Sequence, residues 1–208
     1  MTTVNPADPA SSAPRRGRPA DVDPERVALL ALRHFASHGY DATTMEEIAG
    51  LAGVSRRTLF RYFPSKPDLV WGGMEPVVER MRRVLDAASP DESAREVMAR
   101  AVRESLALDA EAMEATRLRL RLMASDPALI AFGVARLRDN RDALAEFVAR
   151  TLGRPLSDLQ VAVLSDAISS ANFSALLWWA TNRDDGDPAS VVVEALDVVL
   201  AGPIPRLQ

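Results

Sequence analysis

The segment that decides the fold runs from Thr43 to Lys66 and reads TTMEEIAGLAGVSRRTLFRYFPSK. It predicts two short helices that meet across a tight turn. Thr43 stands three residues before Glu46, the spacing of a capping box, and Ser55 is placed to cap the second helix. Gly53 can adopt the positive φ that the turn requires. Apolar residues at three positions lock the pair together, as a helix-turn-helix requires: Ile48, Val54 and Leu59.

The second helix of such a pair enters the major groove of DNA, where its early residues meet base edges. Arginine pairs bidentately with guanine, while hydroxyls and lysine hold phosphates. An arginine-rich helix can also be no more than a solvated face. Because the caps, the turn glycine and the apolar residues occur together, the sequence favours DNA contact. The candidate DNA-binding residues of this segment are Thr43, Thr44, Ser55, Arg56, Arg57, Thr58, Arg61, Tyr62 and Lys66.

Composition and charge agree with a protein that contacts DNA at one end. The chain has 208 residues, 48% of them hydrophobic and 26% charged, which is ample for an apolar core. The formal net charge is −4, but residues 1–66 carry +2 and the remainder −6. An acidic body with a mildly basic head suits such a protein. The absence of cysteine excludes disulfides and thiolate metal sites.

No segment of the sequence has the pattern of a signal peptide or a membrane span. The first twenty residues are polar and rich in Pro, Ala and Ser. The densest apolar run, Phe173 to Ala180, is far shorter than the roughly 18 residues that a membrane-spanning helix needs. We therefore expect a cytoplasmic protein without a membrane partner.

The rest of the chain has helical spacing and no strand-like alternation. A first helix begins at Asp23 and Pro24 and ends at Gly39. A long helix follows the Thr43–Lys66 segment and runs from a capping box at Ser65 and Asp68 to about residue 88. The prediction is an all-α fold of about nine helices, the later ones at about 91–109, 111–124, 127–152, 157–183 and 188–201.

The segment 24–70 closely resembles the DNA-binding domain of TetR-type transcriptional regulators. Two positions depart from the family pattern, which often has tyrosine where this chain has Phe60 and histidine where it has Tyr62. The hydroxyl missing at Phe60 removes one expected phosphate contact, which Tyr62 could replace. The resemblance is carried by Phe35, Gly39, Thr43–Thr44, Ile48–Ala49, Gly53–Val54–Ser55, Thr58–Leu59, Phe63 and Lys66.

This resemblance implies three regions: a disordered basic arm at 1–22, a helix-turn-helix domain at 23–66, and an effector-binding and dimerisation domain at 67–208. In the arm, Arg16 and Arg18 belong to an Arg-Gly-Arg-Pro sequence that can lie in a narrow minor groove. The alternative is a charged tail without contacts. The implied function is repression at a palindromic operator, released when an effector binds, with the helix that begins at Ser65 as the lever.

A palindromic operator requires a two-fold symmetric homodimer. The last two helices, Leu156–Arg183 and Ala189–Ala201, are the natural dimer pair, unless their apolar sides face the chain's own core. The first of them has small residues that permit close approach: Ala167, Ser170, Ala171, Ser174 and Ala175. The apolar stripe of the second is formed by Val191, Val192, Ala195, Val198 and Val199.

The middle helices carry apolar residues that would line an effector pocket or simply form core. A mostly apolar pocket implies a small hydrophobic or long-chain effector. The candidates are Trp71, Met74, Met113, Leu118, Leu122, Phe132, Phe147, Phe173, Leu177 and Trp178, to which Arg117 and Arg121 add charge.

Scattered stretches resemble the mycofactocin-associated subgroup of the family, which is associated with acyl-coenzyme A ligands. They are RYFPSKPDLVWGG, the run from Arg117 to Pro127, and residues 147–150. Arg117, Arg119 and Arg121 could hold coenzyme A phosphates, although alternation on a helix spreads them over different faces. The alternative for at least two of them is salt bridges to acidic neighbours.

Other function classes have weaker support. His34 and His38 share a helix face at the spacing of metal ligands, but no third ligand is evident, so we expect structural histidines. We find no phosphate-binding glycine loop and no nucleophile elbow. The expectation is therefore a protein without catalytic residues, metal or cofactor. An activator, or a regulator that needs no ligand, remains the main alternative to a repressor.

Overall fold

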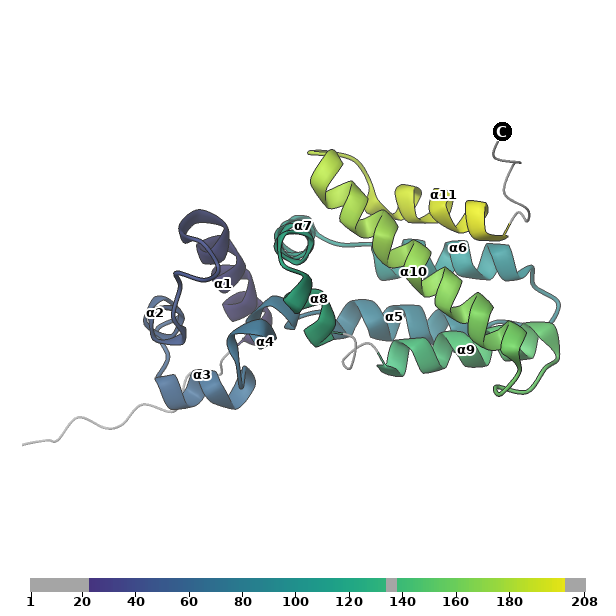
Figure 1. Ribbon diagram of the computed structural model, residues 1–208, viewed down its shortest axis with the longest axis horizontal. Coiled ribbons are helices and arrows are strands. Elements are labelled where there is room, and N and C mark those ends of the chain that lie inside the picture. The colour runs from purple at the N-terminus through teal and green to yellow at the C-terminus, as the bar shows by residue number, and fades with distance from the viewer. Residues whose placement is uncertain (1–22, 134–137, 201–208) are drawn as a thin grey trace, which may run out of the picture.

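The computed structural model describes residues 23–133 and 138–200, with the backbone only for 138–140. The described residues form helices and connecting turns without a strand, as expected. Figure 1 shows the first helices at one end of an elongated molecule and the long α10 lying across the other. The helices are α1 (Pro24–His38), α2 (Met45–Leu51), α3 (Arg56–Tyr62), α4 (Lys66–Trp71), α5 (Glu75–Asp86), α6 (Ala94–Ser105), α7 (Ala110–Ser125), α8 (Pro127–Gly133), α9 (Arg138–Leu152), α10 (Leu159–Asn182) and α11 (Pro188–Leu200).

Helix α1 forms because its ends are capped and one of its faces is apolar. The Asp23 carboxylate accepts the backbone N–H groups of Glu25 and Arg26, at 3.0 and 3.3 Å. Gly39 ends the helix with a φ of 90°, a conformation that favours glycine. The face between these caps is buried: Val27, Ala28, Ala31, Leu32 and Phe35.

The helix-turn-helix is formed by α2 and α3, with one correction to the expected cap. Thr44, not Thr43, begins α2, and its hydroxyl and backbone N–H complete a capping box with Glu47. Gly53 adopts a φ of 65° in the turn. Ser55 caps α3 as expected, since its Oγ accepts the backbone N–H of Thr58 at 3.1 Å.

One of the expected long helices is interrupted, and the described residues contain eleven helices where the sequence indicated about nine. The helix predicted from Ser65 to about residue 88 ends at Trp71 and resumes at Glu75. Between the two parts, Gly73 has a φ of 77°, which an α-helix cannot accommodate. Within the helix predicted at 127–152, the described residues form α8 and α9, and residues 134–137 between them lie outside the described residues.

The apolar core has two clusters, and the first runs from the helix-turn-helix into the body. It contains the buried faces of α1–α4 together with Leu120, Met123, Leu129 and Trp179 from α7, α8 and α10. The second cluster joins α5, α6, α9, α10 and α11. Helices α1 and α4 therefore join the helix-turn-helix to the helices of the body.

Helix α10 is long and apolar enough, by length and composition alone, to cross a membrane. A helix was expected at 157–183, but not one with these properties. Only 22% of its most apolar 18-residue window is buried inside the protein. Helix α10 therefore presents apolar surface to the outside.

Candidate DNA-binding site and effector-binding regions

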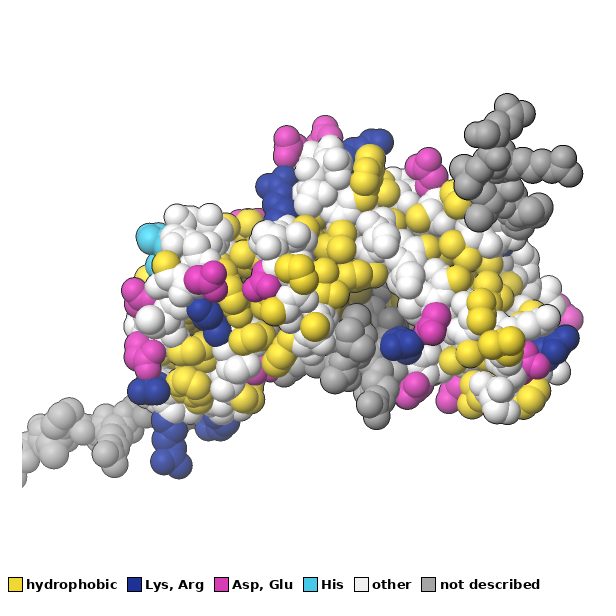
Figure 2. Space-filling model, viewed as in Figure 1, with side chains coloured by type: hydrophobic (Ala, Val, Ile, Leu, Met, Phe, Trp, Pro, Cys, Tyr) yellow, Lys and Arg dark blue, Asp and Glu magenta, His cyan; other side chains and the backbone are white. Residues whose placement is uncertain are grey.

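The outward face of α3 carries three exposed arginines. Arg56 forms a salt bridge of 2.9 Å with Glu46 of α2, and its guanidinium lies 5.3 Å from the centre of the Phe60 ring. Arg57 is exposed, and no hydrogen bond or ion pair of its side chain is recorded among the described residues. Figure 2 shows Lys and Arg side chains gathered at the end of the molecule where α3 lies.

Arg61 and Tyr62 form a unit at the end of α3. Arg61 donates a hydrogen bond of 3.1 Å to the Tyr62 hydroxyl, and its guanidinium lies 4.8 Å from the centre of that ring. The neighbouring Phe60 is partly buried and packs against the first core cluster. The hydroxyl of Tyr62 is thus held beside a cation on the exposed side of the helix.

The hydroxyl residues of the segment divide between exposed and buried positions. Ser55 and Thr58 lie at the start of α3, 2.8 Å apart between their oxygens, and Thr44 is exposed at the start of α2. Thr43 is 2% exposed, and its hydroxyl donates to the carbonyl of Gly39 at 2.8 Å. Thr43 therefore stabilises the α1–α2 turn, and its side chain does not reach the surface.

Lys66 also points into the protein. Its ammonium donates to the carbonyls of Tyr40, Asp41 and Thr43 at 2.8, 3.4 and 3.0 Å, and it lies 4.4 Å from the centre of the Tyr40 ring. An ammonium has three N–H donors, and here each has a backbone partner. In this structure Lys66 holds the α1–α2 turn against α4. Arg16 and Arg18 lie outside the described residues.

Most of the predicted pocket residues come together, but as packed core. Seven belong to the first core cluster or pack against it: Trp71, Met74, Met113, Leu118, Leu122, Phe173 and Leu177. Phe147 belongs to the second cluster, where it lines a small apolar pocket of about 30 Å³. Phe132 and Trp178 are exposed, at 37% and 47%, and the ring of Trp178 lies under the guanidinium of Arg183.

The alternating arginines of α7 bind backbone carbonyls, a use that the sequence analysis did not anticipate. Arg117 donates to the carbonyl of Arg183 and lies 3.9 Å from the centre of the Trp179 ring. Arg121 donates to the carbonyl of Ala180 at 2.7 Å and pairs with the exposed Asp184. Both arginines hold the end of α10 against α7. The alternative of salt bridges to acidic neighbours is met, among the described residues, by Arg121 and not by Arg117.

Arg119, which lies between them in sequence, was considered with them for coenzyme A phosphates but also binds backbone carbonyls. It is 5% exposed, and its Nε and Nη2 donate to the carbonyls of Val70 and Gly72, each at 2.6 Å. Burial lowers the pKa of this guanidinium to about 10, against an opposing influence from Glu75. These carbonyls belong to the end of α4, where a cation is also favoured by the helix dipole.

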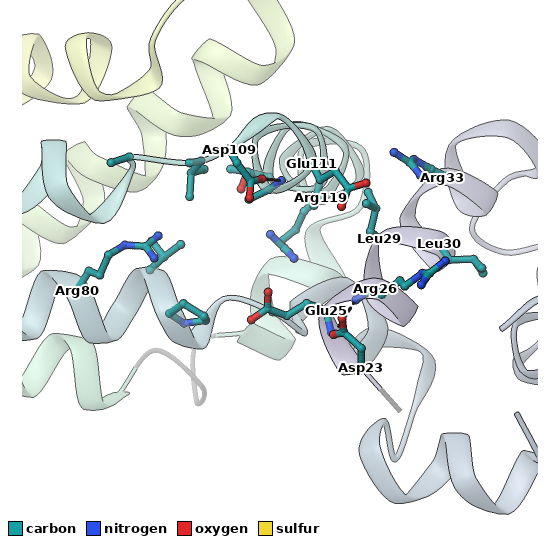
Figure 3. Close-up of a pocket in the computed structure, with 18 residues that line it drawn as sticks. Asp23, Glu25, Arg26, Leu29, Leu30, Arg33, Arg80, Asp109, Glu111 and Arg119 are labelled. Carbon is teal, nitrogen blue, oxygen red and sulfur yellow. Dashed lines mark hydrogen bonds between the residues drawn. The ribbon is translucent and has the colours of Figure 1, made fainter. Parts of the chain in front are cut away.

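Arg119 lines a polar cleft of about 760 Å³ between α1, α5 and α7, shown in Figure 3. Of the residues considered for effector binding, Arg119 alone is among the described residues that line this cleft. The sequence does show that the flanking helices are charged. It does not show which of these charges face one another across a cleft. Its charged lining residues are Asp23, Glu25, Arg26, Arg33, Arg80, Asp109, Glu111 and Arg119.

The outer faces of α10 and α11 leave large apolar side chains in solvent. Leu159, Val163 and Val198 are 76%, 59% and 75% exposed. The small residues Ser170 and Ser174 share the exposed side of α10, whereas Ala175 is buried. In α11, Val192 is also buried in the chain's own core, so the expected stripe is only partly on the surface.

Comparison with known proteins places this arrangement in a family. The model of bacterial regulatory proteins of the TetR family matches residues 30–70, and the model of the MftR C-terminal domain matches residues 92–203. The chain is 29% identical over 189 residues to the mycofactocin biosynthesis transcriptional regulator MftR of Mycobacterium tuberculosis, covering 90% of this chain and 94% of that protein. It is 28% identical to the transcriptional regulator RutR of Escherichia coli over 56% of this chain and 55% of that one.

Solved structures share the fold. The TetR-family repressor FadR of Thermus thermophilus, in complex with lauroyl-CoA, has a TM-score of 0.53 and 25% identity, covering 89% of this chain and 97% of that one. FadR of Bacillus subtilis, in complex with stearoyl-CoA, has a TM-score of 0.61 and 21% identity, covering 86% and 99%. The chain therefore belongs to the TetR family of bacterial transcriptional regulators and carries an MftR-type C-terminal domain.

Proposed function

We propose that this protein is a repressor that binds a palindromic operator as a homodimer and leaves it when a small hydrophobic effector binds. The observation that carries the DNA-binding part is the face of α3. Arg56, Arg57 and Arg61 all extend from one short helix that is capped at its start and packed on α1 and α2. Arginines held on a rigid scaffold suit direct reading of guanine in the major groove.

The dimer proposal is supported by the exposed apolar side chains of α10 and α11. Apolar surface of this kind, on two adjacent helices, is typical of a protein–protein interface. A two-fold pairing through α10 and α11 would bury Val163 and Val198 and would give the two α3 helices the symmetry of a palindrome. It would also account for the apolar character of α10 in a cytoplasmic DNA-binding protein.

The effector proposal is supported by the relatives and by one buried amide. The two FadR structures were solved with acyl-CoA ligands, and their fold is shared with this chain. Asn172 lies in α10, one helical turn from each of the apolar residues Ile168 and Leu176, and within the described residues its buried Oδ1 has no hydrogen-bond partner. An acyl-CoA-like effector, or a water molecule, that donates a hydrogen bond there would satisfy this oxygen.

Helix α4 supplies a route from an effector to the reading helices. Its last residue, Trp71, donates from Nε1 to the carbonyl of Leu129 in α8 at 2.8 Å, and Arg119 of α7 holds the two carbonyls described above. An effector that shifts α7 or α8 would therefore move the end of α4. The start of α4 is tied to the α1–α2 turn through Lys66.

The DNA-binding part is tested with fluorescently labelled fragments of the promoter of the protein's own gene. We expect specific, salt-dependent binding. Arg56→Ala or Arg57→Ala should each reduce the free energy of operator binding by about 1–3 kcal/mol. Arg103→Ala in α6 removes the same charge from an exposed position far from α3 and should bind as wild type. Equal affinity in the wild type and both α3 variants would contradict the assignment.

Removal of residues 1–20 tests whether Arg16 and Arg18 contribute, since it should weaken binding and flatten its salt dependence.

The regulatory part needs two further measurements. Lauroyl-CoA and stearoyl-CoA should lower operator affinity, and free coenzyme A at the same concentration serves as the control without an acyl chain. Deletion of the gene should raise expression from the bound promoter in a reporter assay. A fall in expression would make the protein an activator, and indifference to every acyl-CoA would contradict the effector assignment.

A further inference from the structure

The cleft between α1, α5 and α7 has the size and lining of a small-molecule site. Its volume of about 760 Å³ falls within the range of known ligand pockets. Figure 3 shows Arg119 projecting from α7 into the space between α5 and α1, with Arg80 and Glu25 extending from opposite sides. Eight of its lining residues are charged, so the cleft differs in character from the apolar surroundings of Asn172, where the hydrophobic effector is proposed.

The floor of the cleft holds a buried cation that forms no salt bridge with the described residues, although Glu75 acts on it from a longer distance. Arg119 is 5% exposed, and within the described chain no carboxylate lies at salt-bridge distance from it. Its two recorded hydrogen bonds use Nε and Nη2, and none is recorded for Nη1. A buried charge is ordinarily paired because desolvation is costly. An anion in the cleft would supply the missing partner.

The walls add two arginines whose charge is also not paired. Arg80 of α5 donates only to the carbonyl of Ser105, at 2.9 Å from Nη2, and the side chain of Arg26 in α1 has no recorded partner among the described residues. Arg33 is different, because it forms two hydrogen bonds with Glu114. Arg26, Arg80 and Arg119 are therefore the three guanidinium groups that remain for a ligand.

The carboxylates of the cleft divide in the same way. Asp23 and Asp109 cap α1 and α7 through backbone N–H groups, so their oxygens are engaged. Glu25 and Glu111 line the cleft, and their side chains have no hydrogen bond within the described part of the chain. A ligand that satisfies both kinds of group needs an anion for the arginines and N–H or O–H donors for the two glutamates.

We propose that this cleft binds a small polar metabolite that carries a phosphate or carboxylate together with hydroxyl or amino groups. The anionic group lies against Arg119, between Arg26 and Arg80, and the donors face Glu25 and Glu111. This site is separate from the hydrophobic effector site and would exist whether or not an acyl-CoA binds. Its ligand would contact α1 of the DNA-binding helices and α5 and α7 of the body at once, so its binding would change operator affinity.

Calorimetric titration of the full chain tests binding without DNA. The probes are ribose 5-phosphate, inorganic phosphate and ribose, which separate the anion from the donors. We expect ribose 5-phosphate to bind most tightly, phosphate more weakly, and ribose not at all. Arg26→Ala and Arg80→Gln should each weaken ribose 5-phosphate by about tenfold or more. Arg103→Ala, outside the cleft, should leave it unchanged.

Glu111→Gln separates the two parts of the ligand. It should weaken the binding of ribose 5-phosphate, whose hydroxyl groups face Glu111, but not the binding of inorganic phosphate. All of these variants keep Arg119, which holds the end of α4. A loss of binding therefore does not result from a folding defect at that contact. The proposal is overturned if no anion binds at up to roughly 10 mM, or if Arg26→Ala and Arg80→Gln bind like the wild type. It is also overturned if ribose binds as well as ribose 5-phosphate.

Operator affinity measured with and without ribose 5-phosphate then tests the coupling. A change in wild type that is absent in Arg26→Ala supports it, and binding without any change refutes the coupling but not the site. Failure of acyl-CoA to release DNA would bear only on the proposed effector, so the two ideas fail independently.

Discussion

The indole ring of Trp71 fills the space in which residue 133 would carry a side chain. A Cβ built on Gly133 would lie 1.8 Å from Cζ2 of Trp71, far inside van der Waals contact. Trp71 is the last residue of α4, and its Nε1 donates to the carbonyl of Leu129 in the same short helix as Gly133. The end of α4 thus packs closely on α8, in a socket formed by Leu129 and Gly133 that a side chain at residue 133 would fill.

We therefore expect Gly133→Ala to destabilise the protein. Either Trp71 or α8 must move to admit the methyl group, and overpacking of this kind costs about 1–3 kcal/mol. Urea denaturation, followed by tryptophan fluorescence, measures the change in the free energy of unfolding. The matched control is Gly50→Ala in α2, where no atom lies within 4 Å of the added Cβ. The control should gain about 0.5–1 kcal/mol, and a similar gain at Gly133 would refute the socket.

The DNA-binding helices were predictable because their signals are local. A cap needs a hydroxyl or carboxylate a few residues from its N–H groups, and the α2–α3 turn needs a glycine at positive φ. The one-residue error at α2 is instructive. Thr43 and Thr44 are each followed three residues later by glutamate, so both frames contain a capping box. Only the burial of Thr43 against the α1–α2 turn selects Thr44.

The regions that were mispredicted depend on contacts between distant residues. Arg119 binds carbonyls 47 and 49 residues away in sequence, and nothing near it shows that its charge is buried. The same holds for Arg117 and Arg121, which resembled phosphate ligands but hold the end of α10.

A pH-dependent contribution is expected from the ion pair between α1 and α7. Arg33 donates to Glu114 at 2.8 and 2.6 Å and lowers the pKa of that carboxyl below its usual value of 4.5. A lowered carboxyl pKa contributes stability above about pH 4.5, and this contribution is lost as the pH falls through the folded-state value. Glu114→Gln should therefore melt below the wild type at pH 7.

On acidification the difference in melting temperature between Glu114→Gln and wild type should shrink below about pH 4.5 and close once the pH has fallen below the folded-state pKa of Glu114. Thermal scans at several pH values measure it. Glu96→Gln, an exposed change in α6, controls for the loss of one carboxylate. A difference that is constant from pH 7 to pH 3.5 would show that the pair contributes no charge-dependent stability.

Glu46 is expected to restrain DNA binding. Its carboxylate lies 2.9 Å from Arg56 on the exposed side of the helix pair, so it competes with DNA for that guanidinium. Glu46→Gln releases Arg56 and removes a negative charge beside the phosphates. Operator affinity should rise by about two- to tenfold at low salt, and the gain should shrink as salt is added. Fluorescence anisotropy titrations measure both, with Glu96→Gln again as control. A loss of affinity would mean that Glu46 orients Arg56 for its contact.

The exposed apolar faces of α10 and α11 predict the oligomeric state of two variants. Val163→Asp and Val198→Asp each place a charge where the proposed dimer buries a valine that is 59% or 75% exposed in the single chain. Because a buried unpaired carboxylate is costly, each variant should be largely monomeric at micromolar concentration in light scattering, and its operator affinity should fall with it. Leu51→Asp in α2 replaces an equally exposed leucine, 52% accessible, outside the proposed interface and should remain dimeric. Dimers in both valine variants would place the two-fold axis on another surface.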